Sequence, residues 1–81
     1  MTMSKKDIKK KKLILYDDEV NHVDDVIFAL IYVFGYLDMQ AQQIALLVHV
    51  KGSFCLKEDT VDELNTYKQE LDKFNLKTKI K

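Results

Sequence analysis

The stretch KLILYDDEVNHVDDVIFAL, residues 12–30, contains the pattern on which the fold depends. Its first part, residues 13–16, is a short apolar run of the kind found in buried strands. Its last part places apolar side chains three and four positions apart, which is typical of an amphipathic helix. Between the two runs, and at the start of the second, lie five carboxylates, Asp17, Asp18, Glu19, Asp24 and Asp25. A strand that leads through an acidic loop into a helix raises the question of which cation the loop binds.

Three segments after this strand have the apolar spacing and the end signals of helices. Each begins near a residue whose side chain can accept a hydrogen bond from the first turn, and two of them end at a glycine suited to the left-handed conformation. The expected caps and ends are Asn21 and Gly35 for residues 21–35, Asp38 and Gly52 for residues 38–52, and a capping box of Thr60 with Glu63 for the helix that runs to residue 74.

Two further strands are short. Residues 54–56 form one, and the alternation of Leu76, Thr78 and Ile80 with lysines predicts a half-buried strand at the end of the chain. The element order is therefore β-α-α-β-α-β, which favours an α+β domain with a three-stranded antiparallel sheet and three helices. We expect residues 1–11, which are rich in lysine, to form a disordered extension, and residues 12–81 to form the folded core.

The composition excludes several classes of protein. A chain of 81 residues has room for one domain and leaves little for a large enzyme cleft. Thirteen lysines balance 13 acidic residues, so no net charge points to nucleic acid or to an anionic membrane. The longest apolar run, residues 26–35, is about half the length of a membrane span. A single cysteine, Cys55, fits a reducing compartment, and we expect a cytoplasmic monomer.

The acidic loop does not have the form of a metal site. A calcium loop requires the spacing D-x-[DN]-x-[DN]-G, and both the spacing and the glycine are missing here. Zinc requires three or four nitrogen or sulfur ligands, which His22, His49 and Cys55 do not supply at suitable spacing. No glycine-rich phosphate loop is present either, so we expect neither a metal nor a cofactor.

The candidate catalytic residues do not form a recognisable set. Cys55 falls on an expected strand with no signature around it, and we expect it to be a buried structural cysteine. His49 falls at the edge of the apolar face formed by Ala45 and Val48, where a half-exposed helix histidine is the simplest interpretation. A small hydrolase that uses His49 with an acidic residue is the weakest alternative, because the sequence has no nucleophile or oxyanion-hole motif.

Four stretches together have the order of a known family. LILYDDEVN, residues 13–21, corresponds to a strand that runs into an Asn-Asp-Asp motif, and ALLVHVKG, residues 45–52, to a helix that ends in a Val-His step before a glycine. CLKEDTVDEL, residues 55–64, and LKTKI, residues 76–80, correspond to a strand with its following helix and to a last strand. In this combination residues 12–81 resemble the ClpS family, the bacterial adaptors that bring N-end-rule substrates to the ClpAP protease.

The resemblance implies recognition of an N-degron, which is a free N-terminal amine on a residue with a bulky apolar side chain. Asp17, Asp18 and a neutral ring nitrogen of His49 would then accept hydrogen bonds from the α-ammonium group. The first side chain would enter a pocket lined at the matching positions by Leu15, Asn21, Val23, Val26, Ala45, Val48 and Leu76.

The implied partners are substrate proteins that begin with Phe, Leu, Tyr or Trp and the N-terminal domain of a ClpA-type AAA+ unfoldase. The chain departs from the family in having Asp17 for the usual asparagine, Glu19 for the usual aspartate and Ala45 where methionine is common. Its N-terminal extension is also short. The alternative is a domain of the same fold that docks a partner protein or a ribosomal component through its helices without binding an N-terminus.

Overall fold

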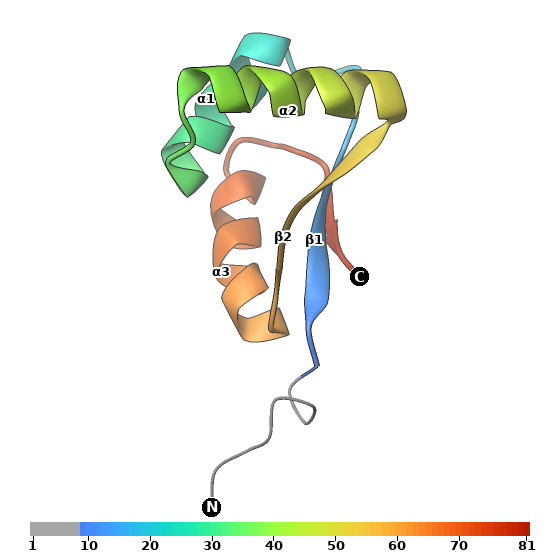
Figure 1. The fold of residues 1–81 in the computed structure, drawn as a ribbon, viewed down its shortest axis with the longest axis vertical. Helices are drawn as coiled ribbons and strands as arrows, with labels where there is room; N and C mark the ends of the chain where they lie inside the picture. The colour runs from blue at the N-terminus through green and yellow to red at the C-terminus, as the bar shows by residue number, and fades with distance from the viewer. Residues whose placement is uncertain (1–8) are drawn as a thin grey trace, which may run out of the picture.

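The computed structural model describes residues 9–81 and has the predicted α+β architecture (Figure 1). The predicted disordered extension falls for the most part on residues 1–8, which lie outside the described residues. Three helices and a three-stranded antiparallel sheet confirm the predicted fold class. The elements in chain order are β1 (Lys11–Tyr16), α1 (Val23–Phe34), α2 (Asp38–Lys51), β2 (Ser53–Asp59), α3 (Val61–Asp72) and β3 (Thr78–Ile80).

Strand β1 lies in the centre of the sheet, with β2 on one side and β3 on the other. Both neighbours run antiparallel to β1. The register with β2 changes between Leu13, which is opposite Lys57, and Ile14, which is opposite Cys55. This β-bulge leaves Leu56 without a partner and turns its side chain into the core, where it is buried.

The strand boundaries differ from the predicted ones. β1 begins at Lys11 rather than at residue 13, and β2 runs to Asp59 rather than ending at residue 56. Both extensions consist of charged residues that apolar periodicity does not detect, and they pair as opposite charges, Lys11 with Asp59 and Lys12 with Glu58. β3 is shorter than predicted, because Leu76 precedes the part of the chain that pairs with β1.

The helix caps are only partly as predicted. Thr60 caps α3 by accepting a hydrogen bond from the N–H of Glu63 at 3.4 Å, and Gly35 and Gly52 take left-handed conformations at the ends of α1 and α2, as predicted. The predicted capping box is only half formed, because the N–H of Thr60 donates to Asp59 and not to Glu63. Asn21 and Asp38 are not caps. Their places are taken by His22 and Leu37, because the side chain of Asn21 is held elsewhere and Asp38 is already the first residue of its helix.

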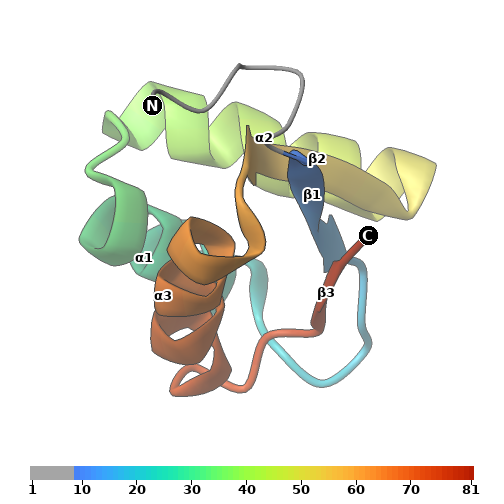
Figure 2. The same cartoon turned by 90° about the horizontal axis from the view of Figure 1, so that it is seen from below.

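The core lies between the sheet and the helices. α3 packs along one side of the sheet and α2 crosses its end, as the two views show (Figures 1 and 2). Within residues 9–81 no helix lies along the other side of the sheet (Figure 2). The largest fully buried side chains are five leucines, Leu13, Leu15, Leu30, Leu64 and Leu71.

The prediction that Cys55 is buried is wrong, because its side chain is exposed. Neighbouring residues of a strand point to opposite faces of the sheet. Cys55 is opposite Ile14, which lies between the core-facing Leu13 and Leu15, so Cys55 points to the side that no helix of the described residues covers. The apolar run at residues 54–56 did not reveal this, because a one-sided sheet needs only alternate residues to be apolar.

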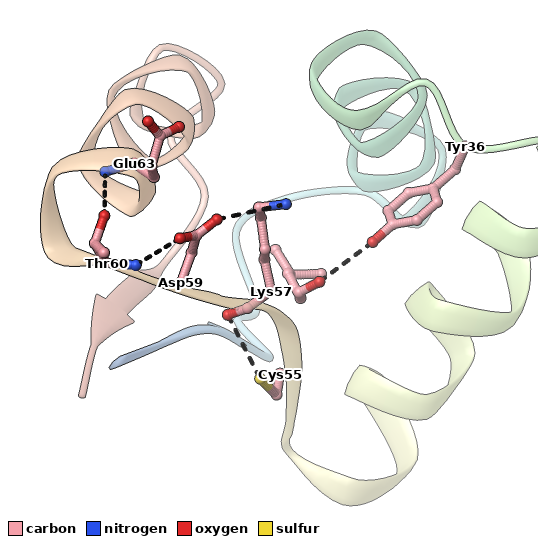
Figure 3. A network of polar contacts seen from close by, with 7 residues as sticks. Tyr36, Cys55, Lys57, Asp59, Thr60 and Glu63 are labelled. Atoms are coloured by element: carbon pink, nitrogen blue, oxygen red, sulfur yellow. Dashed lines mark hydrogen bonds and ion pairs between the residues drawn. The ribbon is translucent and has the colours of Figure 1, made fainter. Parts of the chain in front are cut away.

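The turn from β2 into α3 is held by a set of polar contacts (Figure 3). Asp59 accepts a hydrogen bond from the N–H of Thr60 at 2.8 Å and lies 4.0 Å from the ammonium group of Lys57. From the other side, the hydroxyl of Tyr36 donates to the carbonyl of Leu56 at 3.4 Å. Burial raises the pKa of Tyr36, with a smaller contribution from Cys55, so the phenol remains a donor at neutral pH.

Leu64 provides a test of this core. Replacing Leu64 with alanine should lower the free energy of unfolding by ~2–5 kcal/mol, because the side chain is fully buried and the cavity collapses only partly. Leu37→Ala makes the same chemical change at a side chain that is 70% exposed, and should cost at most about 0.5 kcal/mol. Urea unfolding followed by circular dichroism measures both; equal losses would contradict this assignment of the core.

Candidate functional site

A pocket of about 860 Å³ opens where β1 ends, between the loop after that strand and helices α1 and α2. The structure brings all ten candidate site residues to the lining of this one pocket. They come from five separate parts of the chain: Leu15 from β1; Asp17, Asp18 and Asn21 from the loop after it; Val23 and Val26 from α1; Ala45, Val48 and His49 from α2; and Leu76 from the segment before β3.

The floor of the pocket is apolar. Leu15, Ala45 and Val48 are buried, and Leu76 closes the floor from the segment before β3. Val26 is partly buried against the core, while Val23 is 56% exposed at the mouth. The pocket therefore combines a floor that continues the hydrophobic core with an open side that a ligand can reach.

The polar side of the pocket begins with the loop after β1. The Oδ1 atom of Asp18 accepts hydrogen bonds from the backbone N–H groups of Val20 at 2.9 Å and Asn21 at 2.7 Å. Its Oδ2 atom accepts from the side-chain amide of Asn21 at 3.1 Å. That amide also donates to the carbonyl of Asn75 at 2.9 Å, which connects the loop to the segment before β3.

These contacts determine the charge of Asp18. Burial raises the pKa of its carboxyl group, but the hydrogen bonds from Asn21 and Val20 and the charge of Lys77 lower it by more. The pKa is therefore below the ordinary value of 3.8. Asp18 is ionised at neutral pH and is at the same time the structural centre of its loop.

Asp17 and His49 meet across the pocket because the sheet joins their elements. The N–H of Asp17 donates to the carbonyl of Gly52 at 2.9 Å, which holds the end of β1 against the end of α2. The Oδ1 atom of Asp17 lies 3.8 Å from the Nδ1 atom of His49, with 40% and 77% of the two side chains exposed. Among the residues that the structure describes, the carboxylate of Asp17 accepts no hydrogen bond, so its oxygens are available to a ligand.

Sequence reasoning missed part of the lining. Asp38 and Gln42 lie on the same face of α2 as Ala45 and His49, and the side-chain amide of Gln42 donates to Asp38 at 2.6 Å. Spacing of three and four residues along the helix could have revealed them. No lysine of residues 9–81 lines the pocket, so its charged groups are acidic or histidine. The other lining residues not predicted are Tyr16, His22, Asp24, Ile27 and Leu46.

In the part of the chain that the structure describes, no group of three or more His, Cys, Asp or Glu side chains is arranged to hold a metal ion. No helix there is both long and apolar enough to cross a membrane.

Comparison with known proteins decides which family has this arrangement. The profile of the family described as ATP-dependent Clp protease adaptor protein ClpS matches residues 6–79. The chain belongs to the ClpS family. ClpS proteins are adaptors without catalytic activity, so the hydrolase alternative falls.

Solved structures have the same fold. One of them, ClpS2 of Agrobacterium tumefaciens bound to L-phenylalaninamide, superposes with a TM-score of 0.82 at 22% sequence identity. The match covers 90% of this chain and 95% of the Agrobacterium chain. No curated protein matches the sequence.

Asn21 tests the loop at the pocket. Asn21→Ala removes the amide that binds both Asp18 and Asn75, so the pKa of Asp18 should rise toward 3.8 and unfolding at pH 7 should become easier by ~1–2 kcal/mol. A lowered pKa stabilises the fold above the pKa of the unfolded chain, and this contribution disappears as the pH falls through the folded value. The difference from the parent protein should therefore narrow below pH 3.8.

The measurements are carboxyl-carbon NMR titration of Asp18 and urea unfolding at several pH values. Asn65→Ala is the control, because Asn65 is an exposed asparagine on α3 far along the chain from the loop. An Asp18 titration that is the same in parent and Asn21→Ala would show that the loop does not depend on this amide.

Proposed function

We propose that this ClpS-family adaptor binds N-degrons through a free α-amino group and a bulky apolar first side chain. The observation that supports it most directly is the pairing, in one pocket, of an apolar floor with unpaired acceptors at its rim. An α-ammonium is a cation with three N–H donors on the atom next to the side chain. An N-terminal residue carries a cation and an apolar side chain on the same carbon atom, so it can occupy both halves of the pocket at once.

The acceptors have different roles in this proposal. Three hydrogen bonds within the loop already occupy Asp18, which leaves its Oδ2 atom with room for one further donor. Asp17 and the ring of His49 lie 3.8 Å apart, and within the described residues neither accepts a hydrogen bond. Asp17 and His49 would therefore receive most of the ammonium group, while Asp18 shapes the loop and adds negative charge.

The first side chain would enter the apolar half of the pocket. Transferring a leucine or phenylalanine side chain from water to the floor of Leu15, Val48 and Leu76 is worth ~1.5–3 kcal/mol before ordering costs. Ala45 leaves more space there than a longer side chain would, which favours aromatic first residues. ClpS2 of Agrobacterium was solved with a ligand that has a free amine and a phenylalanine side chain, which is the same chemistry.

Delivery is the second half of the proposed function. A bound substrate would pass to the N-terminal domain of a ClpA-type AAA+ unfoldase, and the cytoplasm is the proposed site of this exchange. Membership of the ClpS family supports a Clp protease as the partner. The lysine-rich residues before β1, 1–10, are the proposed extension that the unfoldase engages.

Blocking the amine tests the proposal directly. A fluorescent peptide that begins with phenylalanine should bind, and acetylation of its amine should weaken binding at least a hundredfold, because the acidic rim then faces a neutral amide. Asp17→Ala should weaken the free peptide about tenfold, whereas Asp25→Ala removes the same charge outside the pocket and should have less than a twofold effect. Fluorescence anisotropy measures all three. Equal binding of the free and acetylated peptides would show that the domain only docks partners and does not bind N-termini.

Ala45 tests the depth of the pocket. Ala45→Met should weaken peptides that begin with phenylalanine or tryptophan by ~1–3 kcal/mol, because the added side chain occupies the floor. Peptides that begin with leucine should lose less. Gln43→Met, on an exposed face of the same helix, is the control. Isothermal titration with peptides that differ only in the first residue gives the comparison, and an equal loss for every first residue would place Ala45 outside the side-chain pocket.

A further inference from the structure

Positive and negative charges are separated along this chain although its formal net charge is zero. Residues 13–50 contain no lysine or arginine. The same span holds six carboxylates at the end of the molecule where the pocket opens, which we call the pocket end: Asp17, Asp18, Glu19, Asp24, Asp25 and Asp38. The lysines fall before and after this span. Pairing of β1 with β3 brings lysines from the two ends of the chain together.

Lys12 of β1 meets three lysines in and beside β3 on the side of the sheet that no described helix covers. Leu13 and Leu15 point into the core, so Lys12, Ile14 and Tyr16 point the other way. Their cross-strand neighbours on β3 lie on the same face. Lys81 is opposite Lys12, Lys79 opposite Ile14, and Lys77 opposite Tyr16, by the pairing and the backbone hydrogen bonds of the two strands.

We call this surface the basic face and define it by Lys12, Lys77, Lys79 and Lys81 around Ile14 and Tyr16. All four lysines are exposed. Within residues 9–81 none of them has a carboxylate within 4 Å, whereas Lys57, Lys68 and Lys73 each do. Glu58 lies across from Lys12 on β2 but forms no such ion pair.

Two lysines of the basic face lie directly opposite each other. Lys12 and Lys81 exchange two backbone hydrogen bonds, of 2.7 and 2.8 Å, and are therefore directly opposite each other. Like charges in this position repel. The ammonium group of Lys81 lies 5.5 Å from the ring centre of Tyr16, farther along the face. On its other side Lys12 is opposite Glu58 of β2, but the two side chains form no ion pair.

We propose that the basic face docks an extended acidic segment of a partner protein. Carboxylates would neutralise opposed lysines, and Ile14 and Tyr16 would add apolar contact between them. Lys77, Lys79 and Lys81 repeat every second residue, so their side chains recur at ~6.6–6.8 Å along the strand. Acidic side chains on one face of an extended peptide have the same spacing. Each carboxylate can therefore lie beside one lysine without any rearrangement of the sheet.

A single-stranded nucleic acid is a poorer match. Binders of that class place several aromatic rings along a charged groove, and this face has one, Tyr16. The acidic pocket end of the same molecule would repel a long polyanion, while a short acidic segment avoids it. Anionic membranes and a second copy of this chain are the other occupants that an experiment must separate.

The test uses the full chain and a labelled twelve-residue peptide of alternating glutamate and serine. At 50 mM salt the peptide should bind, and a matched peptide with glutamine should not. The variant Lys79→Glu with Lys81→Glu should weaken binding at least tenfold. Lys51→Glu with Lys73→Glu changes the net charge equally at exposed positions at the ends of α2 and α3 and should change binding less than twofold. Lys79→Gln with Lys81→Gln provides a milder variant, and thermal unfolding checks that all remain folded.

The other occupants are measured beside the peptide. A twelve-nucleotide single strand and vesicles with 30% phosphatidylserine should bind more weakly than the acidic peptide. In sedimentation the protein should not form dimers that depend on Lys79 and Lys81. The proposal is overturned if the single strand or the vesicles bind more tightly than the acidic peptide, or if dimers of this kind are found. It is also overturned if the acidic peptide does not bind, or if the glutamate variants at Lys79 and Lys81 and at Lys51 and Lys73 weaken its binding equally. Binding of a phenylalanine-initiated peptide should be unchanged in both double variants, which keeps this test separate from that of the N-degron pocket.

Discussion

The antiparallel pairing of β1 with strands on both of its sides is the constraint on which the rest of the structure depends. β1 lies in the centre, and its core-facing residues Leu13 and Leu15 are almost completely buried under the helices. Because side chains alternate along a strand, burying these two leaves Lys12, Ile14 and Tyr16 on the opposite face. One strand thus determines where the core, the pocket end and the basic face lie.

The position of the pocket follows from the place where this pairing stops. After Tyr16 the chain leaves the sheet, and the N–H of Asp17 takes the carbonyl of Gly52 as its last partner. This contact brings the end of α2, with His49, to the acidic loop. The ClpS-family pocket is therefore built at a strand end, where backbone geometry is set by the sheet and the side chains are free to bind.

The site shows how one carboxylate can be structural while its neighbour is available. Asp18 is held by Asn21 and Val20, and its lowered pKa reflects those donors. Asp17, one position earlier, has no such donors within the described residues and faces His49. Sequence reasoning assigned both to the same role, because adjacent carboxylates look alike until the loop is folded. It also expected Asn21 to cap α1, whereas the amide of Asn21 connects two distant segments.

By itself the sequence determined the order of the elements, the α+β class, the glycine ends of α1 and α2 and the Thr60 cap, whereas its resemblance to the ClpS family supplied the ten candidate residues that are found in the lining of the pocket. Those features depend on periodicity, on glycine's access to the left-handed region and on motif spacing, all of which are local or lie at fixed intervals. Only the tertiary structure decided the strand boundaries, the exposure of Cys55, the contribution of Asp38 and Gln42 to the lining, and the meeting of Lys12 with Lys81. The physical reason is that these features depend on which backbones pair and which face of the sheet the helices cover. Both are settled by contacts between residues far apart in the chain.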